Sequence, residues 1–278
     1  MATDESGRPG GGTWGSGEAA ADWQSGVAAR RQVFGPATDR MLDLAGIRAG
    51  SQVLDVGAGS GEQTLGAARR AGPTGAVLAT DISASMLEVA ATAARQAGLA
   101  NVQTRVMDAQ RLELPGASFD VAISRFALML IPDISKALAE THRVLRNGGT
   151  IAALVFESCP FLSIPHSIAR RVGRLTSPPE PFGEFRLAGP GVMSDAYRTA
   201  GFRDVAVHPV STVRRFPSLA AAMQYAVETP LPLRELTSQL DPVQRERAWA
   251  EIEAALGQFA GPDGFASPCE LLIGIGRK

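Results

Sequence analysis

Three glycines at alternate positions are the first feature of this sequence that could do chemistry. Gly57, Gly59 and Gly61 follow the apolar run VLDV and precede the helix-forming run EQTLGAARRA. Glycine tolerates positive φ angles, and without a Cβ atom it lets the backbone approach a ligand closely. The pattern predicts a ligand-binding turn between a strand and a helix, with a plain strand-to-helix turn as the alternative. A dinucleotide fingerprint would place another glycine where this chain has Glu62, so the pattern disfavours NAD.

Two acids end the next predicted strands. Asp81 ends ATD, and Asp108 follows VQTRVM. A carboxylate at this edge of a sheet can accept both hydroxyls of a ribose, and the acids suit a nucleoside that also bears positive charge. The alternatives are a helix N-cap for Asp81 and an Asx turn for Asp108. Asp55, inside the first strand, is predicted to be a buried acid satisfied by backbone donors of the turn.

The elements that must position these residues follow from the rest of the pattern. Short apolar runs alternate with Ala-rich helical runs between Gln52 and Phe156. This alternation predicts the α/β class, with a doubly wound parallel sheet and helices on both faces. Ahead of this core, residues 27–45 predict two short helices separated at Gly35-Pro36.

The remainder of the chain departs from that alternation. A segment rich in Pro and Arg runs from Phe156 to Pro190 and is predicted to be an insertion. It is followed by a predicted helix, strand, helical block and final strand at about residues 192–200, 204–210, 219–260 and 269–276. Residues 1–21, rich in Gly, Ala and Ser, are predicted to form a flexible tail.

Composition excludes several classes of protein. The chain has 278 residues, and 27 Lys and Arg against 28 Asp and Glu give a net charge of −1. Nothing therefore draws the whole protein to nucleic acid. Two cysteines exclude a disulfide framework and a zinc site of several thiolates, and we predict no metal site. With no signal peptide and no apolar run of ~18 residues, we expect a cytoplasmic monomer or homodimer without stable membrane insertion.

The ordered motifs VLDVGAGSG, TDIS, MDAQRLELP, FDVAISRFALMLIPD and HRVLRNGGTIAALVF resemble those of class I S-adenosylmethionine-dependent methyltransferases. The nearest subgroup is that of the ubiquinone/menaquinone-biosynthesis methyltransferases and related small-molecule enzymes. The resemblance covers about residues 50–156. It implies a Rossmann-like, seven-stranded sheet whose last strand, 270–276, runs antiparallel to the others. Asn147 departs from the family, because a proline usually precedes the Gly148-Gly149 turn.

The resemblance also implies a domain organisation. Residues 22–278 would form a single methyltransferase domain with N-terminal helices, in which residues 50–156 are the cofactor-binding core. Helical insertions at 157–190 and about 217–262 would form a lid and shape the acceptor site.

Carried over position by position, the resemblance implies a set of cofactor-binding residues. The glycine turn would pass beneath the methionine portion of S-adenosylmethionine, with Thr64 near its polar end. Asp81 would bind the ribose, Asp108 the exocyclic amine of adenine, and Arg125 and Phe126 would lie beside the sulfonium. The full set is Gly57, Ala58, Gly59, Gly61, Thr64, Asp81, Ile82, Met86, Asp108, Ala109, Arg125 and Phe126.

The implied function is transfer of a methyl group from S-adenosylmethionine to oxygen or carbon of a small, partly apolar metabolite, with S-adenosylhomocysteine as product. The reaction would be an in-line displacement that needs mainly the correct placement of the acceptor. The alternatives are a non-catalytic module that binds S-adenosylmethionine and N-methylation of a small amine. Both alternatives keep S-adenosylmethionine as the ligand; the first has no methyl transfer, and the second has nitrogen as the methylated atom.

Residues of the insertion could serve the acceptor. A general base is needed only if the acceptor must lose a proton. His166 is the best candidate, with a lid histidine of no chemical role as the alternative, and Glu157 is a second. Aromatic residues there and near the N-terminus could line an apolar site, and three arginines could attract an acidic acceptor or be a solvated face. These are Trp23, Phe34, Phe161, Phe182 and Phe185, and Arg170, Arg171 and Arg174.

Overall fold

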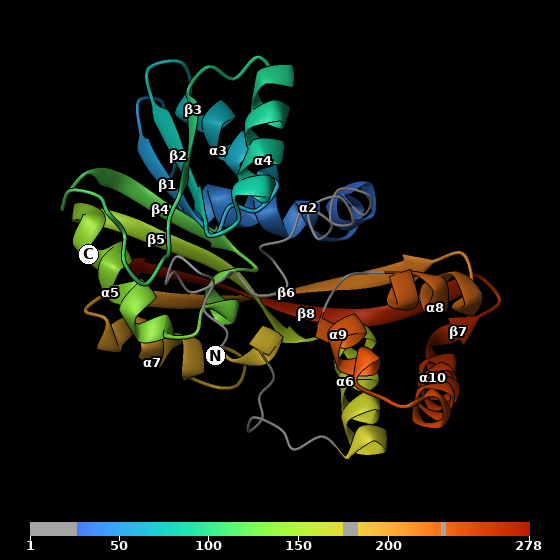
Figure 1. Cartoon of the computed structure of the whole chain (residues 1–278). Coiled ribbons are helices and arrows are strands. Elements are labelled where there is room, and N and C mark those ends of the chain that lie inside the picture. Colours follow the sequence, from blue (N-terminus) through green and yellow to red (C-terminus); the bar gives the residue numbers. More distant parts are fainter. Residues whose placement is uncertain (1–26, 175–182, 229–231) are drawn as a thin grey trace, which may run out of the picture.

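The structure is a computed structural model that describes residues 27–174, 183–228 and 232–278. The predicted tail at 1–21, Trp23 and Phe182 lie outside these residues. A single mixed sheet runs through the described chain in the order β3-β2-β1-β4-β5-β8-β6, and a short strand β7 pairs with β8 (Figure 1). The strands are β1 Gln52–Val56, β2 Ala76–Asp81, β3 Val102–Val106, β4 Phe119–Arg125, β5 Leu145–Ser158, β6 Arg203–Phe216, β7 Ala260–Gly261 and β8 Gly264–Arg277.

The strand directions confirm the predicted fold class. β1, β2, β3, β4 and β5 pair in parallel, whereas β8 pairs antiparallel with both β5 and β6. The chain leaves β1 toward β2 and β3, then returns to the other side of β1 with β4. This reversal creates a crevice at the carboxyl ends of β1 and β4, the place where doubly wound sheets bind ligands.

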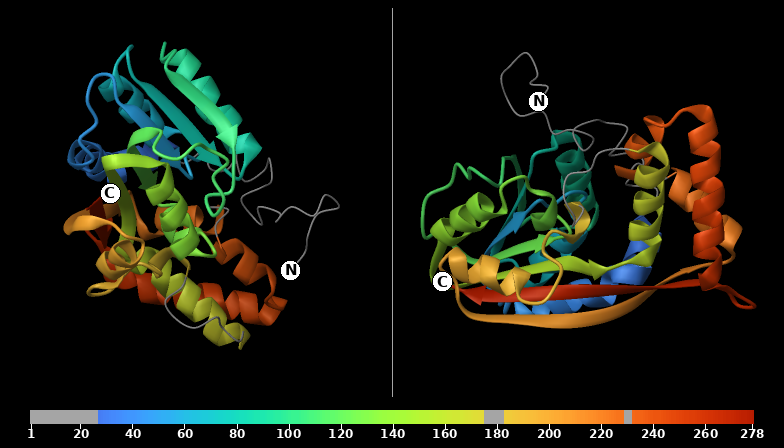
Figure 2. Two further views of the ribbon diagram at one scale, coloured as in Figure 1. Left: turned by 90° about the vertical axis from the view of Figure 1, so that its left-hand side faces the viewer. Right: turned by 90° about the horizontal axis from the view of Figure 1, so that it is seen from below.

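Helices cover both faces of the sheet, as the alternation of runs predicted. Helices α2, α3 and α4 contact one another over one face, and α5 and α7 contact each other over the opposite face (Figures 1 and 2). Local signals start several of these helices; for example, Asp133 caps α5 by accepting a hydrogen bond from the Lys136 amide. The bounds are α2 Val27–Leu44, α3 Glu62–Ala71, α4 Ala84–Gln96, α5 Ile134–Val144 and α7 Val192–Thr199.

The prediction of two short N-terminal helices was wrong. Residues 27–44 form one continuous helix, α2, with Pro36 inside it. Phe34, Ala37 and Met41 lie on its buried side, and this stripe continues past the proline. A proline in a helix interior costs about 3 kcal/mol, but burial of a single large apolar side chain contributes roughly 1.5–3 kcal/mol. Packing of the stripe against the sheet therefore outweighs the local break.

The last two long strands extend beyond the sheet as a two-stranded ribbon. β8 pairs with β5 only from Glu270 onward, but with β6 from Phe265 onward. Figure 2 shows this ribbon running away from the sheet toward a group of helices. A second apolar core forms there from α6, α9 and α10, while α8 packs on the ribbon and contacts α10. These helices are α6 Pro160–Gly173, α8 Leu219–Glu228, α9 Pro232–Ser238 and α10 Pro242–Leu256.

The unusual Asn147-Gly148-Gly149 sequence is held by the C-terminal residue. The Gly148 amide donates to the Lys278 carbonyl at 2.9 Å, and the Lys278 amide donates to the Gly149 carbonyl at 2.9 Å. The Lys278 ammonium also donates to the carbonyls of Arg143 and Leu145. These bonds fix the segment without the proline that the family usually carries there.

Candidate active site

The glycine turn after β1 lies against the end of β2. The amides of Gly57 and Ala58 both donate to the carbonyl of Thr80, at 2.8 and 2.9 Å. Gly57 has a φ of 70°, and a Cβ atom there would collide with the Cβ of Ala127. Both observations require glycine at this position, because the chain must bend sharply while packed against the segment after β4.

Gly61 serves a different purpose from the one expected. A Cβ atom on Gly61 would lie 2.7 Å from the Cβ of Ala90 in α4, and Gly61 does not line the cavity described below. Its lack of a side chain lets α3 begin in close contact with α4. The structure therefore gives Gly61 a packing role.

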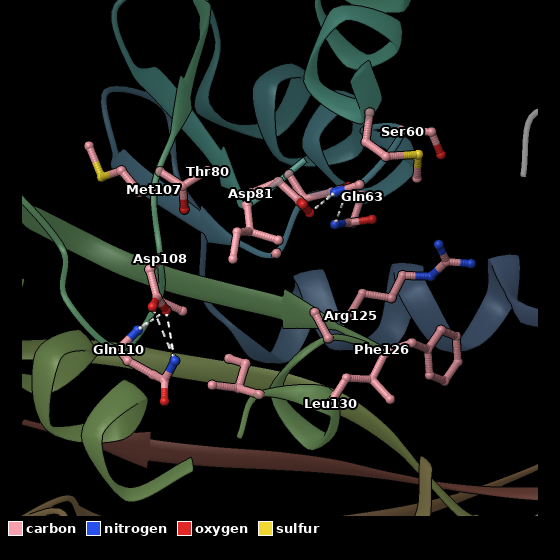
Figure 3. Close-up of a pocket in the computed structure, with 18 of the residues that line it drawn as sticks. Ser60, Gln63, Thr80, Asp81, Met107, Asp108, Gln110, Arg125, Phe126 and Leu130 are labelled. Carbon is pink, nitrogen blue, oxygen red and sulfur yellow. Dashed lines mark hydrogen bonds between the residues drawn. The ribbon is translucent and has the colours of Figure 1, made fainter. Parts of the chain in front are cut away.

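Asp81 joins the turn to the end of β2. Its carboxylate accepts hydrogen bonds from the amides of Gly59, at 2.8 Å, and Ser83, at 2.9 Å. Burial raises the pKa of Asp81, and these backbone donors act against the rise. The cap of α4 is Ser83, which accepts from the Met86 amide. Asp81 is thus not the N-cap, and its oriented carboxylate faces the cavity (Figure 3).

Asp108 forms the Asx turn that was the alternative interpretation of the sequence. Its Oδ1 accepts from the Gln110 amide at 2.9 Å, as in an Asx turn, and the Gln110 side-chain amide donates to both carboxylate oxygens at 3.1 Å. The Asp108 side chain also lines the cavity. The turn therefore orients an acid that still faces the ligand space.

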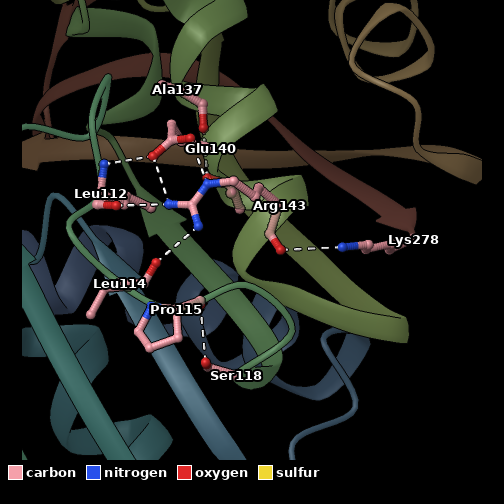
Figure 4. Close-up of polar contacts among 9 residues, drawn as sticks. Leu112, Leu114, Pro115, Ser118, Ala137, Glu140, Arg143 and Lys278 are labelled. Carbon is pink, nitrogen blue, oxygen red and sulfur yellow. Dashed lines mark hydrogen bonds and ion pairs between the residues drawn. The ribbon is translucent and has the colours of Figure 1, made fainter.

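The loop that carries Asp108 is held from below by α5. Arg143 donates to the carbonyls of Leu112, at 2.7 Å, and Leu114, at 2.9 Å, while the Leu112 amide donates to Glu140 at 2.8 Å (Figure 4). Arg143 and Glu140 also form an ion pair. One pair of opposite charges thus satisfies three backbone groups of a loop that has no regular structure of its own.

Asp55 is a buried support for the turn, but its partners differ from those expected. Its carboxylate accepts from Thr64 Oγ1 at 2.6 Å and Gln63 Nε2 at 3.1 Å, which are side-chain rather than backbone donors. Burial raises the pKa of Asp55 to about 7 despite these bonds. Thr64 is fully buried and does not line the cavity. The structure therefore corrects the expectation that Thr64 meets the ligand.

An ion pair and an aromatic group form the far side of the site. Arg125 Nη1 lies 2.6 Å from Glu62 Oε2, with both side chains largely buried. Phe126 follows with a φ of 54°, which is unusual for a residue with a side chain and is the kind of strain found at functional sites. Its ring stacks on Phe156 at 4.5 Å and meets Phe34 edge-on at 4.9 Å. Sequence reasoning did not foresee that Glu62 would lie against Arg125.

These elements enclose a cavity of about 450 Å³. Asp108 lies on one side of it and Arg125 and Phe126 on the other (Figure 3). Apolar side chains supply most of the wall between these polar groups, a composition typical of small-molecule sites. Lining residues are Gly57, Ala58, Gly59, Ser60, Glu62, Gln63, Thr80, Asp81, Ile82, Met86, Met107, Asp108, Ala109, Gln110, Arg125, Phe126, Ala127, Leu130, Ile131 and Pro132.

The predicted base candidates lie away from this cavity. His166 is buried in α6, with Nδ1 2.7 Å from the Leu162 carbonyl oxygen, and it is not a lining residue. Glu157 accepts a hydrogen bond from the Gly189 amide at 3.0 Å, so it secures the insertion. Within the ranges that the structure covers, no group of three His, Cys, Asp or Glu residues is arranged to hold a metal ion.

Parallel strands with a glycine turn at their switch point, and acids after the next two strands, are typical of nucleoside-binding α/β proteins. Comparison with known proteins identifies the family within this class. A family model described as "Methyltransferase domain" matches residues 53–149. Nocamycin O-methyltransferase of Saccharothrix syringae is 30% identical over 258 residues, covering 87% of this chain and 91% of that protein. The chain belongs to the class I S-adenosylmethionine-dependent methyltransferases that act on small molecules.

Two further similarities cover less of this chain. Ubiquinone/menaquinone biosynthesis C-methyltransferase of Hahella chejuensis is 39% identical over 116 residues, which are 41% of this chain and 47% of that protein. A SAM-dependent methyltransferase from Aquifex aeolicus has the same fold, with a TM-score of 0.54 at 21% identity, covering 70% of this chain and 92% of that one. The match to the biosynthetic C-methyltransferase thus covers less than half of either protein. Among the described residues, none of the helices is both long and apolar enough to span a membrane.

Proposed function

We propose that the 450 Å³ cavity holds S-adenosylmethionine in one orientation. Asp81 accepts hydrogen bonds from the ribose hydroxyls, and Asp108 accepts from the exocyclic amine of adenine. The methionine portion passes over the turn at residues 57–59, so that the sulfonium comes beside Arg125 and Phe126. The remaining contacts are apolar and come from Ile82, Met86 and Ala109.

The single observation that carries this proposal is the position of the Asp81 carboxylate. It is held by the Gly59 and Ser83 amides and lines the cavity at the end of β2. A half-buried carboxylate that faces a cavity favours a ligand with hydroxyl donors, because such donors restore the hydrogen bonds lost on leaving water. A ribose offers two adjacent hydroxyls.

S-adenosylmethionine supplies an activated methyl group on a cationic sulfur. The chain's task is to place an oxygen or carbon nucleophile about 3–3.5 Å from that methyl group and in line with the bond that breaks. Phe126, Leu130 and Ile131 give the cavity an apolar rim that excludes water from the reaction. A small, partly apolar acceptor fits this rim, and relatives named as O- and C-methyltransferases support oxygen or carbon as the methylated atom.

The proposal also covers the acceptor site and the general base. The helices at 157–190 and about 217–262 shape the acceptor site. Phe161 of α6 and Tyr225 of α8 lie 6.2 Å apart, and both rings face the guanidinium of Arg214. His166 as a general base remains a prediction. The test is a His166→Gln variant, whose rate should fall with unchanged affinity for S-adenosylhomocysteine if the base assignment is right. An unaltered rate at every pH would remove His166 from the mechanism.

We further propose a cytoplasmic monomer or homodimer with no nucleic-acid partner. The near-zero net charge supports this, because it provides no general attraction to a phosphate backbone. Light scattering during size-exclusion chromatography would measure the mass in solution, and a mass above that of two chains would contradict it.

Incubation with S-adenosylmethionine and a panel of phenols, quinols and amines tests the function. Release of S-adenosylhomocysteine with an oxygen or carbon acceptor is the expected result. Release with amines alone would contradict the choice of acceptor atom. Tight binding of S-adenosylmethionine without turnover across the panel would instead favour a binding module.

A further inference from the structure

A second cavity lies between the start of α2 and the end of β6. Its volume is about 230 Å³. The lining residues are Arg30, Gln32, Val33, Val213, Arg214, Arg215, Phe216 and Tyr225. An apolar cavity of ~150 Å³ is enough to bind benzene, so this space admits a small ring or the end of a larger molecule.

The central feature of this cavity is a buried guanidinium group, that of Arg214, which is 6% exposed. Arg214 lies on the side of β6 that faces α2, as does Thr212, whose hydroxyl donates to the Val33 carbonyl at 2.8 Å. A core position of this kind normally carries an apolar residue. Burying a charged group costs several kcal/mol unless a partner of opposite charge compensates.

Within the described part of the chain, Arg214 forms no ion pair with a carboxylate, and its buried Nε–H finds no hydrogen-bond acceptor. Its guanidinium does meet the buried thiol of Cys159. The Cζ of Arg214 lies against the rings of Phe34, Phe161 and Tyr225, at 5.4, 5.1 and 5.5 Å. Aromatic faces stabilise a cation but do not replace a hydrogen-bond acceptor. The N–H groups of Arg214 are therefore suited to an anion from outside the chain.

The surrounding charges favour an anion as well. Arg125 is paired with the largely buried carboxylate of Glu62, whereas the equally buried guanidinium of Arg214 forms no such pair with a described residue. The donor adds to the excess of positive charge, because its sulfonium and ammonium outnumber its one carboxylate. A cationic amine as acceptor would meet repulsion here, whereas an anionic acceptor would neutralise the excess.

The second cavity is close enough to serve the same reaction. The Phe34 ring contacts Phe126, which lines the cofactor cavity, and also carries the Arg214 guanidinium on its face. Two ring contacts thus separate Arg214 from the wall of the cofactor cavity.

We propose that Arg214 binds a carboxylate of the methyl acceptor, so that the acceptor is an acidic, partly apolar molecule anchored away from the atom that receives the methyl group. This inference rests on the proposed function and narrows its substrate class. Arginine suits the task because its planar fork can donate two parallel hydrogen bonds to one carboxylate. The carboxylate is bound and not itself methylated, since Arg214 lies outside the cofactor cavity.

The test uses the full chain saturated with S-adenosylhomocysteine, titrated with benzoate and with its neutral counterpart benzamide. We expect benzoate to bind at least tenfold more tightly than benzamide. Arg214→Met should abolish this preference and Arg214→Lys, which keeps the charge without the fork, should reduce it. Arg203→Met, which removes an exposed arginine from the start of the same strand, should leave it intact.

Two results would overturn the inference: no preference for benzoate in the unmodified chain, or a full preference in Arg214→Met. If Arg214→Met does not fold, the unmodified chain and Arg214→Lys still test the inference. A preference for benzoate in Arg214→Lys as large as in the unmodified chain would contradict the role of the planar guanidinium. Affinity for S-adenosylhomocysteine is measured in the same samples. If S-adenosylhomocysteine does not bind, the proposed function is refuted. If it binds but the chain shows no preference for benzoate, only this inference is refuted.

Discussion

The carboxylate of Asp81 accepts a hydrogen bond of 2.8 Å from the amide of Gly59. This bond joins the acid at the end of β2 to the glycine turn after β1, so the two motifs form one rigid unit. An acceptor held in a fixed position loses little freedom when a ligand binds, which favours tight and specific recognition. The predictions below test the parts of this unit and the elements that support it.

Gly57→Ala should disrupt donor binding. Its added Cβ would collide with Ala127, whereas an alanine at Gly98, which also has a positive φ, would meet nothing within 4 Å. Both substitutions carry a backbone strain of about 1–3 kcal/mol, but only Gly57→Ala should displace the turn. We expect Gly57→Ala alone to weaken binding of S-adenosylhomocysteine at least tenfold in calorimetric titration. Equal affinities of the two variants would contradict the steric argument.

Arg143→Ala should loosen the loop that carries Asp108. The carbonyls of Leu112 and Leu114 lose their donor, so we expect the free energy of unfolding to fall by about 1–2 kcal/mol. Arg146→Ala is the matched control, because it breaks only a surface ion pair with Asp120, worth roughly 0–1 kcal/mol. Chemical denaturation measures both. If Arg146→Ala lowers the free energy of unfolding as much as Arg143→Ala does, the contacts of Arg143 with the loop do not stabilise the protein more than a surface ion pair does.

The buried Asp55 should make stability depend on pH. Burial raises its pKa from 3.8 to about 7, so the folded state holds a proton that the unfolded state releases in this window. The contribution of Asp55 to stability therefore falls as pH rises from about 4 to 7. Asp55→Asn cannot titrate and should lose this part of the decline.

Urea denaturation across this window measures the effect as a difference between the original chain and Asp55→Asn. The exposed Asp263→Asn is the control and should keep the original dependence. Parallel pH profiles of the original chain and Asp55→Asn would show that Asp55 is ionised throughout.

The sheet and the position of Asp81 could be predicted because both are local in origin. Apolar runs that fill both sides of a strand require burial, and an acid directly after such a run lies at the sheet's edge wherever the strand pairs. The position of Thr64 could not be predicted this way. The first turn of α3 rotates its side chain onto Asp55, which only the packed turn reveals.

Arg214 was missed because its strand was predicted to end too early. The strand was predicted to end at Val210, one residue after Pro209, yet β6 continues to Phe216. A proline is tolerated there because β6 is at the edge of the sheet. The predicted basic face, in contrast, includes Arg171, which pairs with Glu251 of α10. The burial of Arg125 and Arg214 can be recognised only from the folded structure.

The most direct test of the central claim compares S-adenosylhomocysteine with its 2′,3′-dideoxy analogue in the original chain and in Asp81→Ala. If Asp81 holds the ribose hydroxyls, the original chain should bind the complete nucleoside roughly ten- to hundredfold more tightly than the analogue, and Asp81→Ala should bind both alike. An Asp81→Ala variant that still discriminates between the two by the original factor would contradict the assignment of this carboxylate to the ribose.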